Sequence, residues 1–491
     1  MTTVAATVLA GPATGVLIDG HWRAGGPEAP VLDKYTRDPV ATIRHARPGD
    51  TTDAVTAAAR AAERPLPPMR RHEILSAASR LLLARAEGVK AAYVAETGFT
   101  MADADGELAR AAATLRLSAE EAVRLAGEEV PVAAAPGSEG RLAFTIRVPV
   151  GVVGVIAPFN APLNTVAHKI GPAIAAGNAV VLKPAEQTPL SAIALTEVLH
   201  EAGLPPGYLN LVCGPGEVAG AELVADRRVR FLTFTGSTAV GLLVKQRSGI
   251  TKTHLELGAN SASIVAADAD LDLVADLVTR AGYRKAGQVC TSVQRLIADV
   301  RVVDDLAERL RARVGALRAG DPRDGAVQVG PMIAPEEAER ARSWVTEAAS
   351  SGATVLAGGE RDGALLQPTV LRDPAAGTRI MNSEIFAPVV ALVPAQSADA
   401  AIEMVNAGSY GLQAGVFTRD IDVAFDAARR LRVGGVMIND TSSYHADAMP
   451  YGGVKDSGYG LEGPRYAVSE MTDPRIVVLN LRPTTKGAPR Q

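Results

Sequence analysis

The spacing of apolar residues divides the chain into a helical front part and a longer part in which strands and helices alternate. In the front part, apolar residues recur every three to four positions with charged residues between them, which predicts helices over 53–63, 72–95 and 107–126. A break follows near residue 130, and the segment 142–148 has the composition of a strand. We expect this excursion to form a hairpin that extends away from the body of the protein.

From residue 150 onward, short continuous apolar runs alternate with helical patterns. Strands are expected over 152–157, 179–182, 209–212 and 230–234, and helices over 163–176 and 190–202. Strand, turn and helix repeated at this spacing predict a parallel sheet of βαβ units. A second series of the same kind runs from about 263 to about 439 and predicts a second α/β domain.

Composition and charge exclude several classes of protein. The 491 residues exceed what one compact core usually holds, so two or three domains are expected. Fifty basic and fifty-four acidic residues give a net charge of −4, and because no basic block is present we expect no nucleic-acid partner. No apolar run reaches the ~18 residues that span a bilayer, and residues 1–15 lack the basic region of a signal peptide and are expected to form a loose tail. These features favour a cytoplasmic protein.

The two cysteines, Cys213 and Cys290, are too few for a disulfide framework or a zinc site, so no metal is expected. Cys290 lies in a polar segment led by Gly287, which indicates a backbone held close to another part of the protein, although a lone cysteine is usually a small buried apolar residue. Glu256 stands between apolar neighbours, where a carboxylate is either ion-paired or has a raised pKa suited to a base. The amide of Asn160 could stabilise an oxyanion. Taken singly, each of these residues favours a structural interpretation.

The strand ends of the first series carry turns that suit a nucleotide. The usual G-x-G-x-x-G is absent after the first strand, and the similar sequence 214–220 follows a different strand. The segment 234–238 is better placed, because Gly236 lets backbone amides approach a pyrophosphate and Ser237 precedes a helix. A dinucleotide is therefore expected at the carboxyl edge of this sheet.

Lys183 and Glu186 follow the second strand of this series. An acid there can accept hydrogen bonds from both ribose hydroxyls and would repel a 2′-phosphate, which favours NAD over NADP. The neighbouring ammonium could tolerate the extra phosphate, so NADP stays possible. An ordinary surface Lys–Glu pair is the alternative interpretation.

Several of these residues follow one another in an order that resembles the aldehyde dehydrogenase superfamily, over about residues 15–480. The positions that carry the resemblance are Asn160, Lys183, Glu186, 234–237, Glu256, Cys290, 384–386 and 450–453. The sequence around Cys290 is similar to the branch that contains lactaldehyde, non-phosphorylating glyceraldehyde-3-phosphate and phosphonoacetaldehyde dehydrogenases. The resemblance implies NAD(P)-dependent oxidation of an aldehyde to the carboxylic acid through a cysteine thioester.

The resemblance also implies a domain plan of the α/β class. It comprises a Rossmann-like NAD(P)-binding domain over 1–128 and 149–257, an α/β catalytic domain over 258–460, and a small β oligomerisation element with a C-terminal tail over 129–148 and 461–491. The nearly continuous apolar run 475–481 is expected to be a buried strand, because an open apolar edge is prone to aggregate. It would either build a homodimer or homotetramer or close the chain's own sheet.

Site residues follow from the same resemblance. It implies Cys290 as the nucleophile, Glu256 as the general base, Asn160 with the Cys290 backbone N–H as the oxyanion donors, Lys169 close to the catalytic centre, and Glu462 as a second acid near the proton exit. The implied cofactor contacts are Ala157, Pro158, Phe159, Lys183, Glu186, Gly216, Phe234, Gly236, Ser237, Leu257, Glu384 and Phe386. Ala259 and Ala387 stand where the family usually has glycine, and since alanine needs a negative φ, the backbone there is an open question.

The aldehyde is the least defined part of the prediction. The resemblance places along its tunnel His168, Arg284, Thr291 and His445, with Asn164 and Tyr444 as further polar residues. Because such groups are costly to leave unpartnered in an apolar tunnel, we hypothesise a small polar or anionic aldehyde. The alternative is that Arg284 points outward to a helix partner. Two other functions stay open: a CoA-acylating aldehyde dehydrogenase, against which Glu256 argues, and a non-catalytic binding or structural protein on the same fold.

Overall fold

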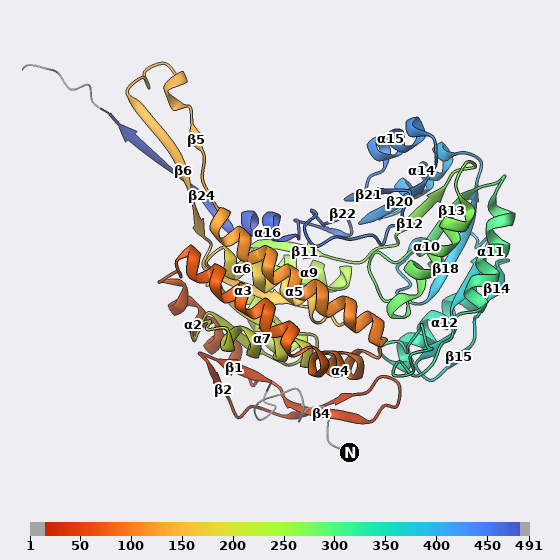
Figure 1. Ribbon diagram of the computed structural model, residues 1–491, viewed down its shortest axis with the longest axis horizontal. Coiled ribbons are helices and arrows are strands. Elements are labelled where there is room, and N and C mark those ends of the chain that lie inside the picture. The colour runs from red at the N-terminus through yellow and green to blue at the C-terminus, as the bar shows by residue number, and fades with distance from the viewer. Residues whose placement is uncertain (1–14, 482–491) are drawn as a thin grey trace, which may run out of the picture.

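Two sheets form the framework of the protein in the computed structural model, which describes residues 15–481 (Figure 1). The predicted N-terminal tail up to residue 14 and the end of the C-terminal tail from residue 482 lie outside the described residues. The first sheet has eight strands in the order β2-β1-β9-β8-β7-β10-β11-β23. Their bounds are β1 Val16–Ile18, β2 His21–Trp22, β7 Val152–Ile156, β8 Ala179–Lys183, β9 Leu209–Val212, β10 Val229–Thr235, β11 Lys252–Glu256 and β23 Gly458–Tyr459.

The second sheet has seven strands in the order β14-β17-β18-β13-β12-β20-β21. Their bounds are β12 Ala262–Val265, β13 Arg295–Asp299, β14 Thr354–Ala357, β17 Thr369–Arg372, β18 Val389–Ala395, β20 Gln413–Phe417 and β21 Gly435–Ile438. In both sheets the central strands run parallel, and antiparallel strands occur only at the edges. The two predicted series of strands and helices, and the α/β fold class, are confirmed.

Helices lie around both sheets, and the predicted helices over 53–63, 107–126, 163–176 and 190–202 are present as α2, α5, α6 and α7. Around the first sheet lie α2 Asp50–Ala62, α3 Pro68–Ala84, α4 Ala86–Thr97, α5 Met101–Arg124, α6 Asn164–Ala175, α7 Leu190–Glu201, α8 Ala221–Ala225, α9 Thr238–Ser248 and α16 Pro464–Glu470. Around the second lie α10 Leu271–Tyr283, α11 Val303–Gly315, α12 Pro335–Ser350, α13 Arg379–Asn382, α14 Ala398–Ala407 and α15 Ile421–Arg430. Smaller pairings are β3 Glu28–Leu32 with β4 Pro39–Arg44, β15 Arg361–Asp362 with β16 Leu365–Leu366, and β19 Tyr410–Gly411 with β22 Val454–Lys455.

The central strands of the first sheet are buried because helices pack on both of its faces. Val153, Val180, Leu182 and Leu211 are all 0 % exposed, as expected for parallel strands without an alternating polar face. The predicted single helix over 72–95 is wrong, since Arg85 leaves the helical conformation and separates α3 from α4. Both helices contact α5, so the chain changes direction between them, and apolar spacing alone does not reveal such a change.

A β arm extends from the body of the protein, as predicted (Figure 1). Its strands are β5 Glu129–Val130, β6 Arg141–Pro149 and β24 Thr472–Asn480, in the order β24-β6-β5. The prediction that the C-terminal strand is buried is wrong for the single chain, because Ile476 is 53 % and Val478 49 % exposed. β24 pairs along its length with β6 and lies at the edge of this three-stranded sheet. None of the described helices is long and apolar enough to cross a membrane.

Candidate active site

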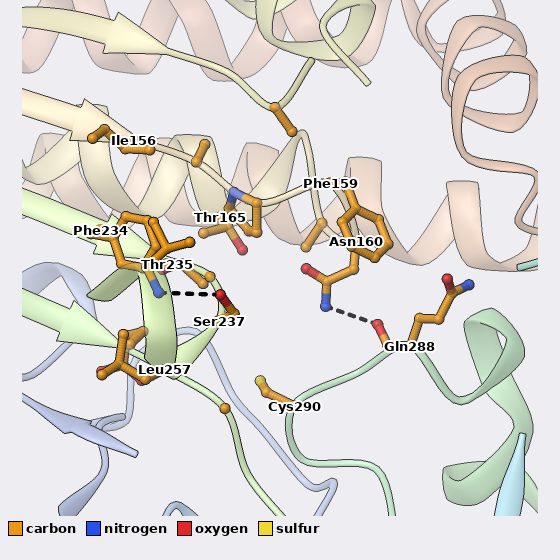
Figure 2. A pocket seen from close by; sticks show the side chains of 18 of the residues that line it. Ile156, Phe159, Asn160, Thr165, Phe234, Thr235, Ser237, Leu257, Gln288 and Cys290 are labelled. Atoms are coloured by element: carbon orange, nitrogen blue, oxygen red, sulfur yellow. Dashed lines mark hydrogen bonds between the residues drawn. The ribbon is translucent and has the colours of Figure 1, made fainter. Parts of the chain in front are cut away.

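A cavity of about 780 Å³ is lined by residues of both α/β units. Asn160, Ser237 and Glu256 face it from segments that follow or end strands of the first sheet. Cys290 and Glu384 face it from segments between elements of the second. Figure 2 shows Asn160 and Cys290 directed into the same opening, with Phe234, Thr235 and Ser237 along another side. Residues far apart in the chain therefore meet in one space.

The backbone that leads to Cys290 follows a constrained path. Lys285, Ala286 and Gly287 have φ values of 52°, 53° and 67°. A Cβ on Gly287 would lie 2.0 Å from the carbonyl oxygen of Ala387, so only glycine fits. The sequence prediction of a close backbone approach at this glycine is confirmed.

The thiol of Cys290 is partly exposed to the cavity and lies 2.9 Å from the hydroxyl oxygen of Tyr451. Burial raises the pKa of Cys290 to about 12, and the carboxylates of Glu384 and Glu256 act in the same direction. The Tyr451 hydroxyl acts in the opposite direction. Without further positive charge at this site, the thiol is therefore protonated at neutral pH.

Glu256 ends β11 and is 3 % exposed. Burial, followed by the negative charge of Glu462, raises the pKa of Glu256 well above its usual value. Its Oε1 lies 3.0 Å from Nε2 of His254, whose pKa burial lowers to about 3, so the histidine is neutral. Of the two alternatives that the sequence left for this acid, the raised pKa is the one that the structure supports. Its Oε2 has no hydrogen-bond partner among the described residues.

Glu462 and Lys169 form a buried ion pair next to Glu256. The ammonium of Lys169, on α6, donates to Glu462 Oε1 at 2.9 Å and to Thr233 Oγ1 at 2.8 Å. Glu462 lines the cavity, whereas Lys169 lies behind it and does not. The charge of Lys169 thus acts on the site through Glu462.

Asn160 is held against the loop that carries Cys290. Its Nδ2 donates to the carbonyl oxygen of Gln288 at 2.8 Å (Figure 2). Its backbone oxygen accepts from Nζ of Lys285 at 3.0 Å, and Lys285 also pairs with Glu107 at 2.7 Å. One amide N–H is thereby fixed, which orients the second N–H of Nδ2.

The predicted cofactor residues lie together at one end of the cavity. Those that line it are Ala157, Pro158, Phe159, Lys183, Gly216, Phe234, Gly236, Ser237, Leu257, Glu384 and Phe386. Glu186 does not line it, but its Oε1 accepts from the backbone N–H of Gly216, which does, at 2.9 Å. The ammonium of Lys183 donates to the carbonyl oxygen of Pro184 at 3.0 Å, and burial lowers the pKa of Lys183.

Glu384 and Phe386 stand on a strained turn. Oε1 of Glu384 accepts from the backbone N–H of Ala259 at 2.9 Å, and burial raises the pKa of Glu384 to about 7. Phe386 has a φ of 50°, which is rare for an aromatic residue, and its ring meets Phe159 edge-on at 5.8 Å. Neither Ala259 nor Ala387 has a positive φ. The two alanines therefore fit where relatives have glycine.

At the other end of the cavity lie polar side chains. Arg110, Asn164, His168, Arg284, Thr291 and His445 line this end. The alternative that Arg284 points outward is wrong, since Arg284 lines the cavity. Its Nη2 donates to Ser443 Oγ at 2.9 Å. Tyr444 is 50 % exposed and does not line the cavity.

Arg110, which lines this end of the cavity, and Asp447, which contacts lining residues but does not line it, were not predicted. Asp447 Oδ1 accepts from Arg110 Nη2 at 2.8 Å and from Nδ2 of Asn164 at 3.3 Å, and lies 2.9 Å from His168 Nε2. Arg110 also contacts Nδ1 of His445. No local signal marks either residue, because Arg110 is one of several charges on an alanine-rich helix and Asp447 lies in an ordinary polar loop.

Comparison with known proteins agrees with this geometry. Residues 22–477 match the model of the aldehyde dehydrogenase family. The chain is 47 % identical to a 3-sulfolactaldehyde dehydrogenase of Priestia aryabhattai, over 95 % of this chain and 98 % of the relative. It is 36 % identical to the crystal structure of aldehyde dehydrogenase 21 from Physcomitrella patens in complex with the reaction product succinate, with a TM-score of 0.93 over 96 % of this chain and 100 % of that one. It is 35 % identical to glyceraldehyde-3-phosphate dehydrogenase GapN of Methanocaldococcus jannaschii complexed with NADP, with a TM-score of 0.89 over 92 % and 98 %.

Proposed function

The chain belongs to the aldehyde dehydrogenase family and is an NAD(P)-dependent aldehyde dehydrogenase; from this premise we propose that its substrate is a small aldehyde with an anionic group, of which 3-sulfolactaldehyde is the leading candidate. The observation that carries the proposal is the guanidinium of Arg284, which lines the cavity, donates to the hydroxyl of Ser443 and forms no ion pair within residues 15–481. Arg284 is partly exposed to the cavity, so an anionic group on a ligand would replace water at its guanidinium with charge-assisted hydrogen bonds.

The groups next to Arg284 favour a substrate with an anionic group over one with a cationic group. The charge of Arg110 is already balanced by Asp447, whereas Arg284 has no acidic partner among residues 15–481. His445 is neutral, because burial lowers its pKa to about 3. Since Arg110 donates to its Nδ1, its Nε2 carries the proton, and this N–H has no partner among the described residues. Arg284 and His445 would together offer donors to a sulfonate, carboxylate or phosphate.

The relatives point in the same direction. The relative at 47 % identity is a 3-sulfolactaldehyde dehydrogenase, and the structure at 36 % identity holds succinate. Both of these molecules are small and anionic. GapN, at 35 % identity, is named for a phosphorylated aldehyde.

In the proposed reaction, the thiolate of Cys290 forms a C–S bond with the carbonyl carbon, and the carbonyl oxygen becomes an oxyanion. The second N–H of Asn160 Nδ2 and the backbone N–H of Cys290 would donate to that oxygen, and a preorganised donor of this kind stabilises the transition state by about 3 kcal/mol. Gly236, Ser237 and Glu384, which line the cavity, would hold NAD(P), and the bound cofactor would supply the acceptor for the hydride of the former carbonyl carbon. The product on the enzyme is a thioester of Cys290.

Glu256 would complete the reaction by taking a proton from a water molecule whose oxygen attacks the thioester carbon. The C–S bond then breaks, the carboxylic acid leaves and the thiolate is restored. The Oε2 of Glu256, without a partner among the described residues, supports water as the acyl acceptor over the thiol of CoA. Acid formed without CoA, in proportion to reduced cofactor, would support this assignment, whereas product formation only after CoA is added would contradict it.

The residues around the cofactor end of the cavity fit a dinucleotide. Ser237 caps α9, whose free N–H groups suit a pyrophosphate. A Cβ on Gly236 would lie 2.6 Å from the ring of Phe234, so the turn requires glycine and leaves its backbone accessible. Oγ1 of Thr235 is buried with no partner among the described residues. We further propose that NAD is preferred over NADP through Glu186, which a comparison of kcat/KM for the two cofactors in wild type and Glu186→Ala tests.

The substrate proposal is tested by removing the charge of Arg284. In Arg284→Met, KM for 3-sulfolactaldehyde should rise about 10- to 100-fold, the loss expected for a charge-assisted hydrogen bond, with a change of less than about twofold for hexanal. Arg280→Met is the matched control, because Arg280 is exposed on the preceding helix and does not line the cavity. Equal losses on both aldehydes, or hexanal as the better wild-type substrate, would contradict the proposal.

Three further proposals concern the domains of the chain, its oligomeric state and its location in the cell. We propose a discontinuous cofactor-binding domain over 1–128 and 149–257 and a catalytic domain over 258–460. The arm of β5, β6 and β24 would join copies of the chain into a homodimer or homotetramer. A cytoplasmic location is proposed as well, and subcellular fractionation tests it.

A further inference from the structure

Tyr451 contacts the sulfur of the proposed nucleophile Cys290 directly. The Tyr451 hydroxyl oxygen lies 2.9 Å from the Sγ of Cys290. It is the one hydrogen-bond partner of this sulfur among the described residues. The ring of Tyr451 is 9 % exposed and packs with Ala259 and Leu412. The hydroxyl is therefore placed against the reacting atom by a buried ring.

The backbone and a neighbouring ring hold Tyr451 in position. Tyr451 and Glu462 exchange two backbone hydrogen bonds, of 3.2 Å and 2.7 Å. The ring of His445 meets the Tyr451 ring edge-on, with centroids 4.7 Å apart, and Arg110 in turn contacts His445. A hydroxyl held this way reaches Sγ without losing side-chain freedom when the thiolate forms.

The charges around Cys290 make such a donor necessary. Glu384, Glu256 and Glu462 all disfavour a negative sulfur, and only the Tyr451 hydroxyl favours it among the groups of this chain that act on the thiol. Burial raises the pKa of Tyr451 well above its usual value. The phenol thus keeps its proton at neutral pH and can donate, but it cannot act as the base.

We propose that the Tyr451 hydroxyl is a catalytic hydrogen-bond donor that stabilises the thiolate of Cys290. In the resting thiol, either atom can donate. When the thiol proton leaves to a water or to Glu256, the phenol proton rotates toward sulfur and donates to the thiolate. The same donor stabilises the sulfur when the C–S bond of the thioester breaks, and the phenol proton stays on oxygen throughout.

The proposal rests on the proposed role of Cys290 as nucleophile, and its test is independent of turnover. The second-order rate constant for alkylation of Cys290 by iodoacetamide is measured from pH 6 to 10, with the modified peptide quantified by mass spectrometry. Tyr451→Phe removes only the hydroxyl. Because burial places the pKa of the Cys290 thiol at about 12, above this range, we expect alkylation to slow about tenfold across the whole range, which corresponds to a rise of about one unit in that pKa.

Two further variants define what the result means. Tyr459→Phe is the matched control, because the Tyr459 hydroxyl contacts Thr253 and Tyr459 does not line the cavity. The alkylation profile of this variant should equal that of wild type. 3-Fluorotyrosine at position 451 is a more acidic donor of nearly the same shape and should lower the thiol pKa. If Tyr451→Phe fails to fold, this variant still decides the proposal.

Failure of the proposed Tyr451 donor and failure of the proposed Cys290 nucleophile give different results. An unchanged alkylation profile in Tyr451→Phe, or one unchanged by the fluorinated residue, overturns the role of the hydroxyl. Turnover that survives in Cys290→Ser overturns the proposed nucleophile instead, whatever the alkylation profile shows. A purely structural role for Tyr451 would lower the thermal stability of Tyr451→Phe and leave the thiol pKa where it was.

Discussion

The ammonium of Lys169 donates a hydrogen bond to the carboxylate of Glu462 at 2.9 Å, and the two residues are 1 % and 6 % exposed. Because of this pair, the pKa of Glu462 lies at about 2, below its usual value. Glu462 is therefore a fixed negative charge beside Glu256, and it keeps the pKa of Glu256 high. Lys169, which does not line the cavity, thus affects the pKa of the proposed base through Glu462.

Glu462→Gln should move the acid limb of the rate profile for thioester hydrolysis to lower pH. The variant removes the charge that raises the pKa of Glu256 and leaves the positive charge of Lys169 unbalanced. Lys169→Met should move the limb the other way. Single-turnover hydrolysis measured against pH checks both, and shifts in the same direction would contradict the argument.

The same pair contributes to stability in a defined pH window. The folded pKa of Glu462, about 2, is below its usual value of 4.5, so its contribution is present above pH 4.5 and is lost as the pH falls toward 2. Breaking a buried pair from one side costs about 3–5 kcal/mol. Glu462→Gln should therefore lower Tm at pH 7 clearly more than at pH 3, in thermal unfolding followed by circular dichroism.

Cofactor binding should strengthen as the pH rises through about 7. Burial raises the pKa of Glu384 to about 7. The family resemblance implies that Glu384 binds the nicotinamide ribose, and a carboxylate accepts hydrogen bonds from ribose hydroxyls better than the protonated acid does. The dissociation constant of NAD(P)H from fluorescence titration should fall from pH 6 to 8 in wild type. It should be higher and flat in Glu384→Gln, whereas the surface variant Glu360→Gln should behave as wild type.

Gly287→Ala should inactivate the enzyme. A Cβ at this position would meet the Ala387 carbonyl oxygen at 2.0 Å, with φ at +67°, so the loop must shift and carry Cys290 with it. A misplacement of about 1 Å costs about 100-fold in rate. kcat is the measurement, and Gly325→Ala, with nothing within 4 Å of its Cβ, is the control that should keep full activity.

Val478→Asp should dissociate the proposed oligomer. Val478 is 49 % exposed on the edge strand of the arm, and burying a charge in an interface without a partner is unfavourable. Light scattering coupled to size-exclusion chromatography should report a smaller species with unchanged circular dichroism. Ile421→Asp, at an apolar residue 65 % exposed on α15, should keep the wild-type mass; a variant of Val478 that does so as well would exclude this strand as the interface.

The local sequence determined the elements and the order of the chemistry. Buried strands such as 179–182 and the turn at 234–238 were predictable, because apolar runs and glycine turns act over a few residues. Gly287 likewise predicted that the backbone before Cys290 lies close to another segment of the chain, which is the one at Ala387. The family resemblance then implied that Cys290, Glu256 and Asn160 act together, and the structure brings all three to one cavity.

Tertiary structure alone decided which charges balance one another. Asp447 neutralises Arg110 and not Arg284, and Tyr451 places its hydroxyl on Cys290. These pairs are separated by 337 and 161 residues, so no spacing in the sequence encodes them. Periodicity reports whether a residue is apolar and which face it occupies, but the partner of a buried polar group depends on how whole elements pack. The sequence therefore indicated the reaction and a small polar or anionic aldehyde, whereas the pairing of Arg110 with Asp447 and the contact between Tyr451 and Cys290 required the fold.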